Sequence, residues 1–200
     1  MERLGIIGGT FDPIHLGHIY IAKQAKEKLN LDKVIFMPAG SQPLKVNKKV
    51  TKASLRLQMV KKAIQGIGYF QVSDYEIKKE GMSYTYLTLE EFYAPNRELF
   101  FITGADCLMN LELWQGIEKI FKCCTFVVFT RPGYDKLELK KKKIKLEEKY
   151  KTKIEVLEVS SPNISSTKIR EKIKDNIDVS NLLPEGILEI IKEHGLYREW

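Results

Sequence analysis

The stretch Leu4–His18, LGIIGGTFDPIHLGH, decides the fold of this chain. Its apolar start predicts a buried strand, the glycine pair predicts a tight turn, and the residues from Leu16 onward predict a helix. These three parts together make an anion site, because glycines allow close backbone approach and a helix start offers unpaired N–H groups. We therefore expect phosphate to bind here. The candidate nucleotide-binding residues of this turn are Gly8, Gly9, Thr10 and Phe11.

A pair of histidines, His15 and His18, distinguishes this turn from other phosphate loops. Their spacing of three places both imidazoles on one face of the first helical turn, where both can reach one ligand. The pair could instead be two structural residues or half of a zinc site. Zinc needs three or four ligands, the remaining histidine is His194, and Cys123 and Cys124 are adjacent and flanked by apolar residues. Catalysis is the favoured interpretation, with no metal ion held by the protein's own side chains.

The composition indicates one folded unit. With 200 residues, of which 44% are hydrophobic, the chain can bury the core of one large domain. The beginning of the chain lacks the pattern of a secretory leader, and no apolar run is long enough to span a bilayer. Three cysteines make a poor disulfide framework and suit a reducing compartment. We expect a cytoplasmic protein without membrane contact; the sequence is compatible with a homo-oligomer.

The basic charge is concentrated in one segment. The formal net charge is +7, and residues 136–153 hold nine lysines and three glutamates, a net of +6. Leu137, Leu139, Ile144, Leu146 and Tyr150 recur there at near-helical spacing, so the lysines are expected to cover the wet face of a surface helix. Nucleic acid is a less favoured partner, since no aromatic residues interleave with the lysines.

Short apolar runs alternate with helical patterns along the chain, which predicts an α/β fold with a doubly wound, mostly parallel sheet. We expect one domain over residues 1–200, with a small helical subdomain at about residues 165–200. Ligands bind such sheets at the carboxyl ends of the strands, near a switch in strand order. The expected strands are 4–7, 34–37, 70–72, 99–103, 125–130 and 154–159; the expected helices are 16 onward, 52–65, 85–94, 115–121, 136–150, 166–175 and 184–194.

A second phosphate motif follows the last expected strand. Ser165 or Ser166 would cap a helix, and Arg170 lies one turn beyond Ser166 on the same face. Hydroxyl and N–H donors followed by a guanidinium suit terminal phosphate oxygens.

The two motifs together give the chain a resemblance to the nucleotidylyltransferase superfamily. His15-Leu16-Gly17-His18 matches its HxGH signature, and Ile164–Arg170 matches its ISSTxxR motif. The fuller string GGTFDPIHLGH is most similar to the nicotinate-mononucleotide adenylyltransferases. The resemblance implies that Ile164, Ser165, Ser166 and Arg170 grip the β- and γ-phosphates of ATP.

The resemblance extends to the loops that follow the other strands. It implies that Lys45 contacts phosphate, although Leu44 replaces the family's histidine, and that Arg131 reaches the adenine region. It also implies that the Ser83-Tyr84-Thr85 backbone holds the nicotinate carboxylate, although Thr85 could equally be a helix N-cap.

The segment Gly104-Ala105-Asp106 ends a predicted strand. An aspartate there can accept hydrogen bonds from ribose hydroxyls, and Trp114 offers a flat face to an aromatic ring, although it could equally be a core anchor. The resemblance implies that Gly104 and Asp106 meet the adenosine ribose and that Trp114 stacks on the pyridine.

The implied reaction is transfer of AMP from ATP to nicotinate mononucleotide. The attacking phosphate is already mostly ionised, so positioning and cations suffice for catalysis, and His15, His18, Lys45 and Arg170 are the candidate catalytic residues. Mg²⁺ is expected to bind mainly through ATP phosphates and water. Two alternatives stay open: another acceptor, such as nicotinamide mononucleotide or pantetheine phosphate, and a non-catalytic nucleotide-binding module.

Overall fold

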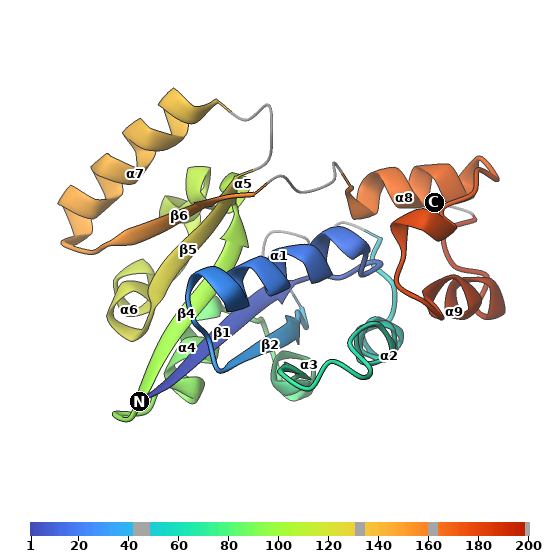
Figure 1. The fold of residues 1–200 in the computed structure, drawn as a ribbon, viewed down its shortest axis with the longest axis horizontal. Helices are drawn as coiled ribbons and strands as arrows, with labels where there is room; N and C mark the ends of the chain where they lie inside the picture. Colours follow the sequence, from blue (N-terminus) through green and yellow to red (C-terminus); the bar gives the residue numbers. More distant parts are fainter. Residues whose placement is uncertain (42–48, 131–134, 160–163, 199–200) are drawn as a thin grey trace.

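A six-stranded parallel sheet forms the centre of the computed structural model, which describes residues 1–41, 49–130, 135–159 and 164–198. The strand order is β3-β2-β1-β4-β5-β6, and every neighbouring pair is parallel (Figure 1). This order reverses direction beside β1, as in doubly wound nucleotide-binding folds. The strands are β1 (Glu2–Gly9), β2 (Lys33–Pro38), β3 (Phe70–Val72), β4 (Arg97–Gly104), β5 (Thr125–Thr130) and β6 (Ile154–Glu158).

Helices cover both faces of the sheet, and each face has its own hydrophobic core. Because side chains alternate along a strand, Ile7 joins one core with α1 and α2, whereas Leu4 and Ile6 join the other with α4 to α7. The helices of these layers are α1 (Leu16–Lys28), α2 (Ala53–Ala63), α3 (Tyr75–Lys78), α4 (Thr85–Phe92), α5 (Ala105–Met109), α6 (Ile117–Cys123) and α7 (Lys136–Tyr150).

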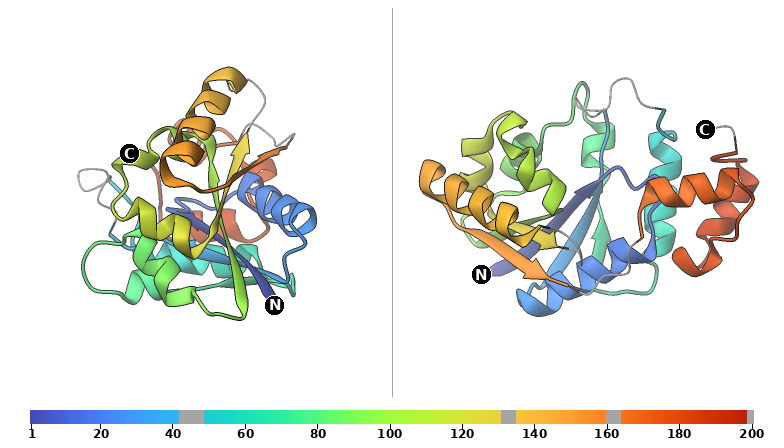
Figure 2. Two further views of the ribbon diagram at one scale, coloured as in Figure 1. Left: turned by 90° about the vertical axis from the view of Figure 1, so that its left-hand side faces the viewer. Right: turned by 90° about the horizontal axis from the view of Figure 1, so that it is seen from above.

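The final helices, α8 (Ser166–Lys174) and α9 (Ile187–Glu193), lie at the end of the molecule opposite α6 and α7 (Figures 1 and 2). They share the core of α1 and α2 through buried side chains such as Ile169 and Ile187. A 3₁₀ turn, Ser180–Leu182, separates the two helices. This packing brings the last part of the chain next to the segment that follows β1.

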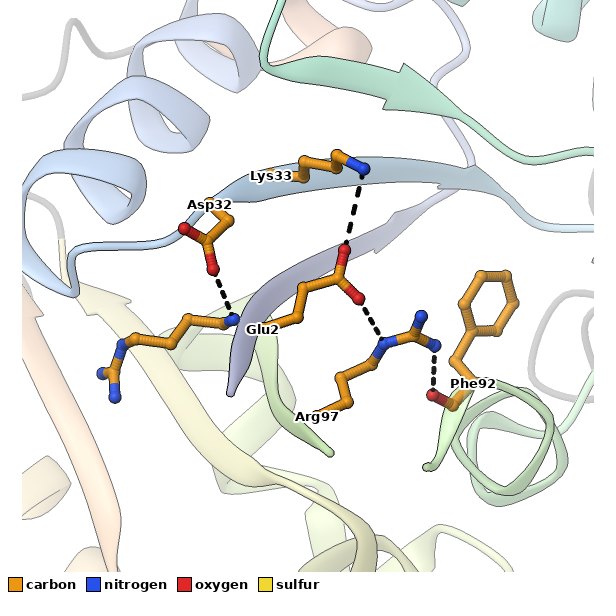
Figure 3. A network of polar contacts seen from close by, with 6 residues as sticks. Glu2, Asp32, Lys33, Phe92 and Arg97 are labelled. Atoms are coloured by element: carbon orange, nitrogen blue, oxygen red, sulfur yellow. Dashed lines mark hydrogen bonds and ion pairs between the residues drawn. The ribbon is translucent and has the colours of Figure 1, made fainter. Parts of the chain in front are cut away.

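Charged groups join the amino ends of three strands. Glu2 pairs with Arg97 at 2.8 Å and with Lys33 at 3.7 Å, so one carboxylate links β1, β4 and β2 (Figure 3). Arg97 also donates to the carbonyl of Phe92 at 2.8 Å, which fixes the end of α4. These contacts lie at the amino edge of the sheet, away from the carboxyl edge where ligands bind in this kind of fold.

The structure confirms the α/β class and each expected strand to within two residues. The short helices α3 and α5 were not predicted, because four or five residues are too few to show a helical period. The expectation that Thr85 caps α4 is wrong: Thr85 is the first helical residue, and Tyr84 precedes it without a side-chain cap.

Helix α7 has a narrower apolar face than its sequence suggests. Leu139 and Leu146 are buried, as expected. Leu137 and Ile144 are instead 72% and 43% exposed, because they lie on a different side of the helix. Lys142, Lys145 and Lys149 form ion pairs with Glu112, so part of the lysine-rich surface is matched by a carboxylate.

In the described part of the chain, no helix is both long enough and apolar enough to cross a bilayer.

Candidate active site

A cleft of about 550 Å³ opens at the carboxyl ends of β1 and β4, where the strand order switches. This is the position expected for a ligand in a doubly wound sheet. The cleft brings together residues from the glycine turn, the start of α4 and the segment after β4. Eight sequence-predicted residues line it: Gly8, Gly9, Thr10, Ser83, Tyr84, Thr85, Asp106 and Trp114.

The two histidines lie at the start of α1. His15 occupies the N-cap position and is 1% exposed, while His18 lies three residues on and is half-buried. Their rings stack with centroids 3.7 Å apart and planes at 24°. The backbone N–H of His15 donates to Nδ1 of His18 at 3.2 Å. This bond places the proton of a neutral His18 ring on Nε2, where it can be donated to a phosphate oxygen.

Glycine at position 17 permits this stack. A Cβ atom there would lie 3.0 Å from both Cε1 and Nδ1 of His15. Such contacts are too short, so a side chain would displace the His15 ring. The HxGH spacing thus has a local steric reason.

Phe11 supports the second ring. Its φ of 51° is left-handed, and its ring meets His18 edge-on with centroids 5.0 Å apart. Phe11 is 2% exposed, so its side chain belongs to the core, and any contact with a nucleotide would come from its backbone.

The serine–arginine motif lies against the connection between β1 and α1, residues 10–15, which we call the histidine loop. Ser165 caps α8 by accepting from Lys168 N at 3.2 Å. Ser166 Oγ donates to the Pro13 carbonyl at 2.9 Å, and Arg170 Nη1 donates to the Asp12 carbonyl at 2.7 Å. The two motifs, more than 140 residues apart in the sequence, therefore meet at one loop.

Trp114 and Asp106 form part of the cleft beyond β4. Trp114 lines the cleft and contacts Phe101 and Phe126 edge-on, with centroids 6.2 and 6.3 Å away. It is thus both a core anchor and a cleft residue, and the two interpretations of the sequence are compatible. Asp106 lies in the first turn of α5 and is exposed, and Gly104 is the N-cap residue of the same helix.

A buried network that sequence reasoning missed holds the loop after β1. Arg56 on α2 is 2% exposed and donates to three carbonyls: Thr51 at 2.9 Å, Thr10 at 2.7 Å and Ala39 at 2.7 Å. Burial lowers the pKa of Arg56, and the nearby Asp12 carboxylate opposes that effect. An arginine within a helical pattern normally indicates a solvated face, so the sequence carried no signal for this role.

The cleft also contains a carboxyl group that was not predicted. Glu76 on α3 lines the cleft, and its Oε1 accepts a hydrogen bond from Thr88 Oγ1 at 2.7 Å. Burial raises the pKa of Glu76, and the hydrogen bond from Thr88 works against this shift. The carbonyl of Glu76 accepts from Ser83 Oγ at 3.4 Å, which ties α3 to the segment before α4.

Two candidate residues, Lys45 and Arg131, lie outside the described residues, as does Leu44. Ile164 is 7% exposed and packs in the core with α1 and α8, directly before the capping serine. Within the described ranges, no three His, Cys, Asp or Glu side chains gather closely enough to hold a metal ion.

Comparison with known proteins adds family membership to this geometry. Residues 6–172 match the family model described as Cytidylyltransferase-like. A relative from Clostridium botulinum (strain Eklund 17B / Type B), named "Probable nicotinate-nucleotide adenylyltransferase", is 53% identical, and the alignment covers 100% of both chains. A relative of the same name from Clostridium beijerinckii is 52% identical over 99% of this chain and 100% of its own.

Among solved structures, the nicotinic acid mononucleotide adenylyltransferase of Plasmodium falciparum complexed with NaAD is similar, with a TM-score of 0.77. Its sequence identity is 20%, over 98% of each chain, so this likeness concerns the fold. The same conclusion follows from the stacked histidine pair at the start of a helix, from the cleft at the switch in strand order and from the full-length relatives at about half sequence identity. The chain belongs to the Cytidylyltransferase-like family and, within it, to the nicotinate-nucleotide adenylyltransferases.

Proposed function

We propose that this chain transfers AMP from ATP to nicotinate mononucleotide, giving nicotinate adenine dinucleotide and pyrophosphate in NAD biosynthesis. One observation carries the proposal: the stacked pair His15 and His18 begins the helix that follows the glycine turn, which lines the cleft, and the serine–arginine turn of α8 holds the same loop. Family membership supports the same activity.

The chemistry needs anions brought together rather than a general base. An oxygen of the acceptor phosphate attacks the α-phosphorus of ATP, the bond from that phosphorus to the oxygen bridging to the β-phosphate breaks, and pyrophosphate leaves with the bonding electrons. The attacking phosphate is mostly ionised at neutral pH because its second pKa is about 6. Catalysis then depends on in-line positioning and on donors placed where negative charge develops.

The chain supplies those donors from two directions. In this mechanism Nε2 of His18 donates to the transferring phosphoryl group, and His15 orients the His18 ring through the stack and the 3.2 Å bond to Nδ1. Arg170 and Lys45 offset the charge of the leaving pyrophosphate. Backbone donors complete the phosphate site from the two turns Gly8-Gly9-Thr10-Phe11 and Ile164-Ser165-Ser166.

The acceptor and the adenosine are assigned to the rest of the cleft. Trp114 faces a space lined by Ser83, Tyr84 and Thr85, which suits a flat pyridine ring with a carboxylate at the start of α4. Asp106 suits hydroxyls of the adenosine ribose, next to Gly104, and Arg131 is assigned to the adenine.

The oxygen donors of the cleft suit a magnesium ion that is bound mainly by the nucleotide. The cleft offers scattered oxygen donors, among them Thr10, Asp106 and Asn110, rather than several carboxylates at one point. Mg²⁺ keeps several waters and binds phosphates readily, so we propose that it enters mainly through ATP and water. When bound, it would neutralise charge on the triphosphate.

We further propose that the chain works in the cytoplasm as a single catalytic domain. Its last part, from about residue 165, would be a helical subdomain that contributes to the same site. The contacts of Ser166 and Arg170 with the loop after β1 support this view.

An acceptor panel tests the proposal. Purified protein, ATP and Mg²⁺ are mixed with nicotinate mononucleotide, nicotinamide mononucleotide or pantetheine phosphate, and pyrophosphate release is measured. We expect the fastest release with nicotinate mononucleotide. A higher kcat/KM with either of the other two acceptors would reassign the substrate to that acceptor. No pyrophosphate release with any of the three, alongside measurable ATP binding, would favour a non-catalytic nucleotide-binding module.

A further inference from the structure

The last residues of the described chain reach the histidine loop through one tyrosine. The hydroxyl of Tyr197 donates to Oδ1 of Asp12 at 2.7 Å, and the two residues are 1% and 4% exposed. The other carboxylate oxygen of Asp12 accepts from the backbone N–H of Thr51 at 3.1 Å. Burial and the Asp12 charge both raise the pKa of Tyr197, so its phenol stays protonated and remains a donor.

Asp12 is thus held through both its side chain and its backbone by the last part of the chain. Its carbonyl accepts from Arg170 on α8 at 2.7 Å, while its carboxylate accepts from Tyr197 beyond α9. Asp12 lies three residues before His15, within the same short connection between β1 and α1. A shift of Asp12 would therefore displace the start of α1, which carries both imidazoles.

The backbone is strained at both ends of this contact. Phe11, next to Asp12, has a φ of 51°, and Tyr197 has a φ of 68°. Residues with side chains rarely adopt left-handed φ values, and such strain persists only where the surrounding contacts over-determine the conformation. A buried tyrosine hydroxyl needs some acceptor, and here the acceptor is the carboxylate of the loop that leads to both histidines rather than a neighbouring group of the C-terminal helices.

We propose that Tyr197 is a positioning residue for adenylyl transfer. Through Asp12 it fixes the loop that carries His15 and His18 relative to Arg170, and it touches no reacting atom. This inference rests on the proposed function, which it extends by making the end of the chain a part of the catalytic geometry. The structural alternative is that Tyr197 contributes only to the stability of the helices around it.

Tyr197→Phe is the main test, because it removes one hydroxyl and keeps the buried ring. Ile187→Val is the matched control: it trims a fully buried side chain of the same core on α9, far in sequence from the loop. At a temperature where both variants are folded, we expect Tyr197→Phe to lower kcat roughly tenfold with little change in the KM for ATP. The control should retain wild-type kcat.

A double-mutant cycle with Asp12→Ala, which removes the acceptor of the Tyr197 hydroxyl, tests whether the hydroxyl acts through the carboxylate. If it does, adding Tyr197→Phe to Asp12→Ala should change kcat by less than about twofold, because the hydrogen bond is already absent. A further loss as large as that of Tyr197→Phe alone would contradict the proposal.

The imidazole NMR signals give a readout that does not require turnover, because the chain has only three histidines. Tyr197→Phe should shift the signals of His15 and His18, whereas Ile187→Val should leave both in place. Unchanged signals together with a kcat equal to that of the control would overturn the role of Tyr197 while the proposed function stands. A wild-type protein without turnover would overturn the proposed function instead, and the NMR signals would then decide the positioning role alone.

Discussion

His15 and His18 stack ring on ring, with centroids 3.7 Å apart, at the first turn of α1. The contact fixes the plane of each imidazole before any ligand arrives, and Phe11 meets the His18 ring edge-on at a centroid distance of 5.0 Å. Donors that are already oriented need no rearrangement during the reaction, which is the physical basis of electrostatic preorganisation. The arrangement therefore predicts that losing either ring affects the rate more than the binding of substrates.

His18→Ala should lower kcat by about 100-fold while the KM for ATP changes much less, because the lost Nε2 donor acts where charge develops in the transition state. Pyrophosphate release at saturating acceptor measures both constants. His194→Ala, the same change at an exposed histidine after α9, serves as the control and should behave as wild type. A variant with raised KM and normal kcat would show that His18 only binds substrate.

Gly17→Ala should lower kcat roughly tenfold without destabilising the fold. The new methyl group would lie 3.0 Å from the His15 ring and force that ring to shift within the stack, whereas alanine is a better helix former than glycine. Gly68→Ala is the matched control, since a Cβ there meets no atom within 4 Å. Thermal unfolding and steady-state kinetics on both variants separate the effects, and equal kcat values for both would rule out the steric account.

The sheet and its order of elements could be predicted because continuous apolar runs such as those of β4 and β5 alternate with helical patterns. The histidine pair and the serine–arginine turn could be found because their residue types and spacings are unusual. The structure brings these two motifs together through the bonds from Ser166 and Arg170 to the loop after β1.

The residues that position the loop could not be predicted in the same way. Arg56 and Tyr197 act through contacts with residues 46 and 185 positions away, and nothing in their local patterns indicates such partners. Glu76 lies on a helix of four residues, too short to show a period. Cys107 is half-buried and lines the cleft, because α5 begins directly at the end of β4.

Arg56→Lys should lower the free energy of unfolding by about 3 kcal/mol. The guanidinium donates to three carbonyls from a buried position, and a lysine ammonium cannot reproduce that fork. Urea denaturation monitored by tryptophan fluorescence measures the loss. Arg198→Lys, at an exposed position, is the control, and similar midpoints for both variants would show that the three carbonyls are satisfied in another way.

The free energy of unfolding should vary with pH in the acidic range because of Glu112. Hydrogen bonds from Lys142 and then Lys149 lower the pKa of Glu112 from 4.5 to about 2. A carboxyl group whose pKa is lowered by folding stabilises the native state above its unfolded pKa, and the effect disappears as pH falls to the folded value. The stabilisation that Glu112 gains from these lysines should therefore be complete above pH 4.5 and should be lost as the pH falls to about 2.

Glu112→Gln tests this by removing the charge while keeping the shape of the side chain. Its unfolding midpoint should lie below that of the wild type near neutral pH, and the gap should close as pH falls from 4.5 to about 2. Added salt should narrow the gap at neutral pH, because the Glu112 side chain is partly exposed and screening weakens its attraction to the lysines. Glu118→Gln, at an exposed position on α6, provides the control. A gap that is the same at every pH and salt concentration would mean that Glu112 stabilises the junction between α7 and the segment before Trp114 by packing rather than by charge.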